Sequence, residues 1–176
     1  MMTSQTFDAD LTMINELVYI KGGLIMSNLK RHTESEAYGA CSFELNGLKI
    51  EHRTSKTTPT KTGQFVTIWK RSTAGITTPF EISDDIDFVV VTSRSGENVG
   101  QFIFPKLVLV DEGVFAQNGK GGKRGIRVYP TWDTTHSKQA ERTQSWQAKY
   151  FFSIHSNSPM NIDLVRPCLL YTSRCV

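Results

Sequence analysis

The segment Phe88-Val89-Val90-Val91-Thr92 decides the fold, because it is a continuous apolar run that follows an acidic connector. An unbroken apolar run of this length is typical of a strand that is buried on both faces. It therefore predicts the central strand of a sheet. Gln101–Pro105 predicts another strand, whereas residues 107–110 fit either a further strand or a short helix.

Upstream of this run, alternating polar and apolar residues predict a β-hairpin. Cys41–Leu45 and Leu48–Arg53 alternate, and Asn46-Gly47 between them is the strongest short hairpin signal in the chain. A Thr/Pro/Lys loop at residues 57–62 leads to Gln64–Lys70, which predicts the next strand. The three strands are expected to form a meander.

A helix is expected before the hairpin. Apolar residues recur at three- and four-residue spacing over residues 8–30, with Asp8 or Asp10 placed to cap the start. Gly22-Gly23 would weaken this helix or end it, because glycine is a poor helix former.

A second helix is expected towards the other end of the chain. The basic, glycine-rich loop Asn118–Gly125 precedes a short strand at Ile126–Tyr129, and Thr134 or Thr135 caps a helix that runs to about Ser153. The face of this helix is partly polar, which suits a helix that lines a site. The expected fold is α/β (α+β), with an N-terminal helix, a mixed or antiparallel central sheet of about five to seven strands and a C-terminal helix packed on the sheet.

The length of 176 residues suits one domain that can bury a core without disulfides. No apolar run approaches the roughly 20 residues that cross a bilayer, and the N-terminus lacks the order of a secretory signal, so a cytoplasmic location is expected. Cys168–Val176 back-translates to a transposon mosaic end of the kind found in sequencing adapters. We therefore expect one domain at residues 1–167 and an adapter artefact at 168–176, which leaves Cys41 without a disulfide partner.

Charge is unevenly distributed, although the formal net charge is only +3. Residues 48–78 contain six basic residues and one acidic residue, residues 79–99 contain five acidic and one basic, and residues 120–127 contain four basic and none acidic. This segregation creates a local positive field that favours a phosphate-bearing ligand; the alternative is a solvated, charged sheet face. Aromatic residues near these segments could stack on bases, namely Trp69, Tyr129, Trp132 and Trp146.

Familiar catalytic and metal-binding patterns are missing from the sequence. The loop 119–125 resembles a phosphate cradle, but Arg124 stands where a nucleotide hydrolase needs Ser or Thr, so a phosphate clamp and a plain loop both stay open. His32, His52, His136 and His155 show no zinc-ligand spacing, and no metal or cofactor is expected.

Metal-dependent nuclease chemistry would require clustered carboxylates beside a lysine. Glu51 and Asp87, with Lys56 or Lys61, are weak candidates for these roles. Glu51-His52-Arg53 has the outline of a Glu-x-Lys motif with arginine in place of lysine. The sequence therefore favours binding over catalysis.

Several blocks in order resemble the bacterial MepB family. They are residues 53–66 with Trp69–Arg71, residues 100–106, residues 123–130 with Trp132, and residues 139–147. The resemblance covers nearly all of residues 10–155. It implies a nuclease-like scaffold, similar to restriction endonucleases and tRNA endonucleases, and a role in nucleic-acid binding.

We hypothesise that polar and aromatic residues of these blocks meet in one basic cleft between the sheet and the last helix, where they bind phosphates or bases. The expected partner is DNA or RNA, with no membrane; a metal-dependent nuclease and a small-anion or nucleotide sensor are the alternatives. The expected binding residues are Arg53, Lys56, Lys61, Gln64, Lys70, Arg71, Gln101, Lys123, Arg124, Arg127, Tyr129, Trp132, Gln139, Gln144 and Trp146.

Overall fold

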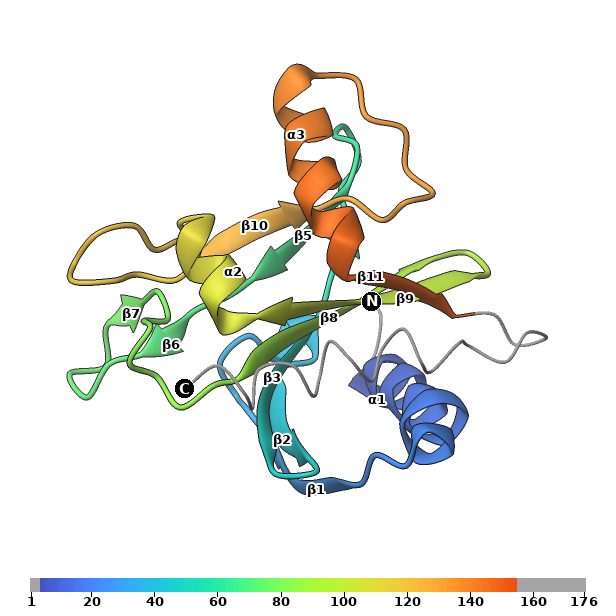
Figure 1. Ribbon diagram of the computed structural model, residues 1–176, viewed down its shortest axis with the longest axis horizontal. Coiled ribbons are helices and arrows are strands. Elements are labelled where there is room, and N and C mark those ends of the chain that lie inside the picture. The colour runs from blue at the N-terminus through green and yellow to red at the C-terminus, as the bar shows by residue number, and fades with distance from the viewer. Residues whose placement is uncertain (1–3, 155–176) are drawn as a thin grey trace.

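A six-stranded mixed sheet lies at the centre of the structure, a computed structural model that describes residues 4–154 (Figure 1). The strand order is β1-β2-β3-β8-β9-β11; β3 and β8 run parallel, and the other neighbours are antiparallel. The predicted α+β class with a mixed central sheet is confirmed. The strands are β1 (Met26–Arg31), β2 (Cys41–Leu45), β3 (Leu48–Thr54), β8 (Phe88–Ser95), β9 (Asn98–Pro105) and β11 (Phe151–Ile154).

The apolar run that predicted a central strand forms the start of β8, between β3 and β9. Phe88 and Val90 pack in the core on one face of the sheet, and Val89 and Val91 pack in the core on the other face. All of these side chains are at most 1% exposed. Because both faces of β8 are apolar, the sheet has to be covered on both sides.

One face of the sheet is covered by the N-terminal helix α1 (Ser4–Ile14), a π-helical turn (Asn15–Tyr19) and a 3-10 turn (Ile20–Gly22). The predicted helix over residues 8–30 was too long, because Gly23 adopts a left-handed conformation (φ 73°) and residues 26–31 form β1. Arg94 at the end of β8 binds the Asp10 carboxylate of α1 at 2.6 Å. This ion pair fixes the helix against the sheet.

The opposite face is covered by two smaller sheets and the remaining helices (Figure 1). One of them has three strands in the order β10-β5-β4, and the other pairs β6 with β7. The three-stranded sheet will be called the small sheet, in contrast to the six-stranded main sheet. The elements of this layer are β4 (Lys56–Thr57), β5 (Gln64–Thr67), β6 (Lys70–Arg71), β7 (Thr77–Thr78), α2 (Lys106–Asp111), β10 (Gly125–Val128) and α3 (Lys138–Gln147), with 3-10 turns at Glu36–Tyr38 and Ala148–Tyr150.

The hairpin β2–β3 is confirmed, with Asn46 and Gly47 both at positive φ as its turn requires. The expected meander is wrong, because β3 pairs with β8 and the chain leaves the main sheet before β5. Residues 106–111 form a helix, which settles the alternative that the sequence left open.

The last predicted helix has different ends in the structure. It starts after Ser137, whose hydroxyl accepts a hydrogen bond from the Ala140 amide, and it ends at Gln147. Residues 151–154 form the edge strand β11 instead.

The proposed adapter-derived residues 168–176, including Cys168 and Cys175, and also His155 lie outside the described residues. None of the helices in residues 4–154 has both the length and the apolar character needed to cross a membrane.

A directional chain of buried polar groups runs across the α1-facing side of the sheet. The Tyr19 hydroxyl donates to Gln101 Oε1 (2.7 Å), and Gln101 Nε2 donates to Thr92 Oγ1 (3.0 Å). The Thr92 hydroxyl is then available to donate to His52 Nε2 at 2.8 Å. His52 is consequently neutral, with its proton on Nδ1, which lies 3.6 Å from Cys41 Sγ.

Burial holds the pKa of His52 well below its ordinary value of 6.5, at about 4. In the unfolded chain this histidine is protonated below its ordinary pKa, so unfolding takes up a proton between about pH 4 and 6.5. The free energy of unfolding therefore decreases as the pH falls through this range.

We expect His52 to lower the free energy of unfolding by about 3 kcal/mol between pH 7 and pH 4. Urea denaturation at several pH values should show this decrease in the wild type and a shallower pH dependence in the His52→Gln variant. Identical pH dependence in the two proteins would show that folding does not lower the pKa of His52.

Candidate functional site

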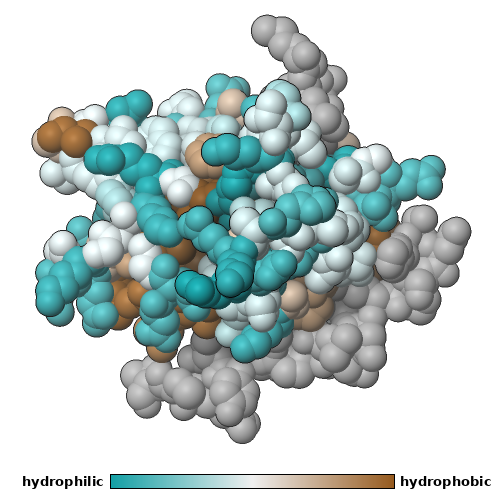
Figure 2. Space-filling model, turned by 90° about the horizontal axis from the view of Figure 1, so that it is seen from above, coloured by the Kyte–Doolittle hydropathy of each residue, from teal (hydrophilic) through white to brown (hydrophobic). Residues whose placement is uncertain are grey.

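A cleft of about 710 Å³ lies between the small sheet and α3. Figure 2 looks onto this end of the molecule, where hydrophilic side chains dominate the surface. The cleft is lined by Lys61, Phe65, Glu112, Val114, Lys123, Gly125, Ile126, Arg127, Tyr129, Ser137, Gln139, Ala140, Thr143, Trp146 and Gln147. It thus combines cations, aromatic rings and helix hydroxyls, with one carboxylate.

Two glycines allow aromatic rings to lie against the small sheet. A Cβ atom at Gly63 would lie 2.7 Å from the Tyr129 ring, and a Cβ atom at Gly125 would lie 2.5 Å from the Phe65 ring. A side chain at either position would force the neighbouring ring to shift. The glycines therefore hold open the space in which the two rings form the floor of the cleft.

The wall formed by α3 is attached to β10 through Gln147, which is completely buried. Its Oε1 accepts from the Tyr129 amide and its Nε2 donates to the Arg127 carbonyl, both at 2.9 Å. The Trp146 ring packs 5.4 Å from the Phe104 ring of the main sheet. These contacts set the distance between the helix and the small sheet.

The cations of the cleft have no anionic partners among the residues that the structure describes. Arg127 donates to the Thr62 carbonyl (3.1 Å) and to the Thr58 hydroxyl (2.6 Å). Among residues 4–154, no carboxylate lies within ion-pair distance of Arg127, Lys61 or Lys123. Uncompensated positive charge beside a concave surface attracts anions.

The cleft brings together part of the expected binding set, from segments far apart in the chain. The expected binding set did not include Phe65, Thr143 and Ser137, which also line the cleft. The sequence feature that could have indicated Phe65 as a lining residue is its position two residues after Gly63, in a strand that is followed by a basic segment. The expected residues that line the cleft are Lys61, Lys123, Arg127, Tyr129, Gln139 and Trp146.

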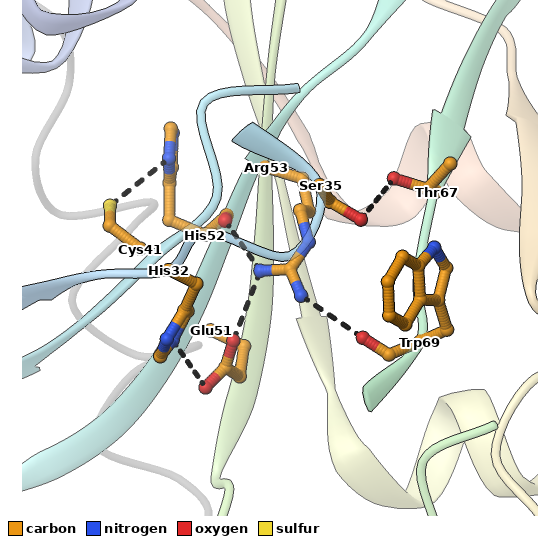
Figure 3. Close-up of polar contacts among 8 residues, drawn as sticks. All are labelled: His32, Ser35, Cys41, Glu51, His52, Arg53, Thr67 and Trp69. Carbon is orange, nitrogen blue, oxygen red and sulfur yellow. Dashed lines mark hydrogen bonds and ion pairs between the residues drawn. The ribbon is translucent and has the colours of Figure 1, made fainter. Parts of the chain in front are cut away.

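Arg53 is a buried core residue instead, at 2% exposure. Figure 3 shows its guanidinium between Glu51 and Trp69. Its Nη1 donates to Glu51 Oε2 (3.0 Å) and to the His52 carbonyl (2.9 Å), and its Nη2 approaches the Trp69 carbonyl (3.5 Å). Arg53 therefore links β3 to Trp69, which follows β5 in the chain.

Gln64 and Gln101 also have tasks in the core. Gln64 accepts from the Ser55 hydroxyl (2.6 Å) and donates to the Arg94 carbonyl (3.0 Å), so it joins the small sheet to the main sheet. Gln101 belongs to the buried polar chain described above. Each is 1% exposed, and neither side chain can reach a ligand in this structure.

The other expected binding residues lie outside the cleft lining. Most of them have contacts elsewhere in the layer of small sheets and helices that covers the face of the main sheet opposite α1. Lys70 pairs with Asp84 (2.6 Å), Arg71 stacks on Trp69 (5.3 Å), Lys56 lies over Tyr38 (4.7 Å), Arg124 donates to the Thr77 carbonyl (3.3 Å), Trp132 contacts Phe151 edge-on (5.3 Å), and Gln144 donates to the Pro130 and Asp133 carbonyls.

The weak nuclease candidates are engaged in different contacts. Glu51 lies between Arg53 and His32, whose Nε2 is 3.5 Å from Glu51 Oε1 (Figure 3). The Asp87 carboxylate accepts from the Lys49 amide at 2.8 Å. Within the part of the chain that the structure describes, no three or more His, Cys, Asp or Glu residues are grouped so that they could hold a metal ion.

Comparison with known proteins places this arrangement in context. A family model described as MepB-like matches residues 32–153. A crystal structure of MepB is similar at 29% identity and a TM-score of 0.73, over 85% of this chain and 97% of that chain. The bacterial homing endonuclease I-Ssp6803I is 16% identical with a TM-score of 0.44, over 81% of this chain and 86% of that chain. The search of curated proteins finds no match.

We expect Gln147→Ala to lower the free energy of unfolding by roughly 2–4 kcal/mol, because it leaves the buried Tyr129 amide and the part-buried Arg127 carbonyl without their partner. Gln139→Ala removes an exposed glutamine from the same helix and should change the free energy of unfolding by less than about 0.5 kcal/mol. Urea denaturation measures both variants. Equal stability of the two would show that Gln147 does not attach α3 to β10.

Proposed function

Since the chain belongs to the MepB-like family and its cleft gathers cations beside aromatic rings, we propose that it binds nucleic acid, with a single-stranded segment seated between the small sheet and α3. The observation that carries the proposal is the placement of Lys61, Lys123 and Arg127 around one cleft, without anionic partners in the described residues.

The phosphate groups are assigned to these cations. Arg127 is held by its bonds to Thr58 and Thr62, so its guanidinium is already positioned when a ligand arrives. Lys61 and Lys123 are exposed and can each follow a phosphate as point charges. Glu112, the carboxylate in the lining, disfavours phosphate on its own side of the cleft.

The bases are assigned to the aromatic floor and wall. Phe65 and Trp146 are half-buried, so each has ring surface available, whereas Tyr129 is only 9% exposed. Stacking on an aromatic side chain does not depend on base identity. Gln139 and Thr143 supply polar groups on the helix side. The combination suits binding with weak sequence preference.

A single strand suits the cleft better than a duplex does. A volume of 710 Å³ lies in the range of pockets that enclose ligands of a few hundred daltons. The bases of a duplex are stacked on one another and cannot reach Phe65 and Trp146. We propose binding without hydrolysis, because Glu51 and Asp87 are engaged by Arg53 and by the Lys49 amide.

The test is fluorescence anisotropy with a labelled single-stranded oligonucleotide at several salt concentrations. We expect the Lys61→Gln/Lys123→Gln double variant to bind about tenfold more weakly, at roughly threefold per exposed phosphate contact. The slope of log affinity against log salt should become shallower by about 1.4, for two lost contacts with a single strand.

The matched control is Lys21→Gln/Lys30→Gln, which removes the same charge from two exposed residues, one in the 3-10 turn Ile20–Gly22 and one in the edge strand β1, neither of which lines the cleft. It should retain the wild-type affinity. If the wild type bound no strand at low salt, the proposal would be refuted. Binding of a mononucleotide as tight as that of the strand would instead indicate a nucleotide sensor.

A further inference from the structure

The exposed side of α3 carries a basic face that the cleft does not include. Lys138 and Arg142 are exposed and lie four residues apart in α3, which places them on the same side of the helix, and the exposed Lys149 follows in the 3-10 turn Ala148–Tyr150. They will be called the α3 basic face. From Lys138 to Arg142 the α-helical part of this face extends about 6 Å along the helix axis.

This charge does not stabilise the helix that carries it. Lys138 is the first residue of α3, where a cation opposes the positive end of the helix dipole. Arg142 follows four residues later, and like charges at this spacing repel each other. Among residues 4–154 no carboxylate lies within ion-pair distance of the face, the nearby Glu141 included. An anionic partner would relieve both repulsions.

The α3 basic face is continuous with the cleft. Arg142 is three residues after Gln139 and four residues before Trp146, and both of these residues line the cleft. Residues at these spacings are neighbours on a helix surface. Arg142 therefore stands at the rim, and the hydrophilic end of the molecule in Figure 2 includes α3.

We propose that the sugar-phosphate backbone of a bound single strand leaves the cleft past Trp146 and continues along the α3 basic face, where Arg142 and Lys138 bind successive phosphates. This inference rests on the proposed function, and it deepens that function by assigning a longer footprint to the strand. A row of cations adjoining the cleft matches the regular charge of a polynucleotide backbone. Mononucleotides are too short to reach it.

The test compares two labelled single strands, one of about four nucleotides that fills only the cleft and one several times longer. Lys138→Gln/Arg142→Gln should weaken binding of the long strand about tenfold, at roughly threefold per contact, and leave the short strand unchanged within twofold. Lys61→Gln/Lys123→Gln should weaken both strands. Lys21→Gln/Lys30→Gln is the charge-matched control and should weaken neither.

Several results would overturn the inference while the proposed function stands. One is unchanged affinity of the Lys138→Gln/Arg142→Gln variant for the long strand; another is an equal loss for both strands, which would place the α3 basic face inside the short footprint. If the Lys138→Gln/Arg142→Gln variant lost the wild-type binding to polyglutamate but bound both strands as the wild type does, the α3 basic face would be assigned to an acidic protein. If neither strand bound the wild type, the proposed function itself would fail.

Discussion

The requirement that β8 be buried on both faces determines the architecture. Phe88 and Val90 need a cover on one side, which the N-terminal helical segment supplies. Val89 and Val91 need a cover on the other side, where residues 4–154 supply no single long helix. The small sheet, α2 and α3 share that task. Because α3 stands against the edge of the small sheet and does not lie flat on it, the shared cover leaves a cleft.

Local patterns predicted the parts of the fold that depend on neighbouring residues. The hairpin followed from alternation and Asn46-Gly47, and the central strand followed from an apolar run. The pairing of β3 with β8 could not be predicted this way, because it joins segments more than 30 residues apart and no local signal specifies it. The end of α3 was missed for a related reason: β11 is a strand because it pairs with β9.

The candidate site was predicted in part. Charge segregation indicated Lys61, Lys123 and Arg127, which folding brings to one cleft. It could not separate these from Arg53, Gln64 and Gln101, because a polar residue in a strand looks the same in sequence whether it faces a ligand or a buried partner. The α3 basic face went unnoticed because its three cations are separated in the sequence by uncharged residues and by Glu141, and so do not form a basic segment.

The side chain of Gln147 has a consequence for the edge of the small sheet. β10 is an edge strand, and its outward-facing Arg127 carbonyl and Tyr129 amide are the groups that would pair with another chain. The carboxamide of Gln147 occupies both of them, as a further strand would. A helix residue thus closes an edge that would otherwise invite intermolecular strand pairing and aggregation.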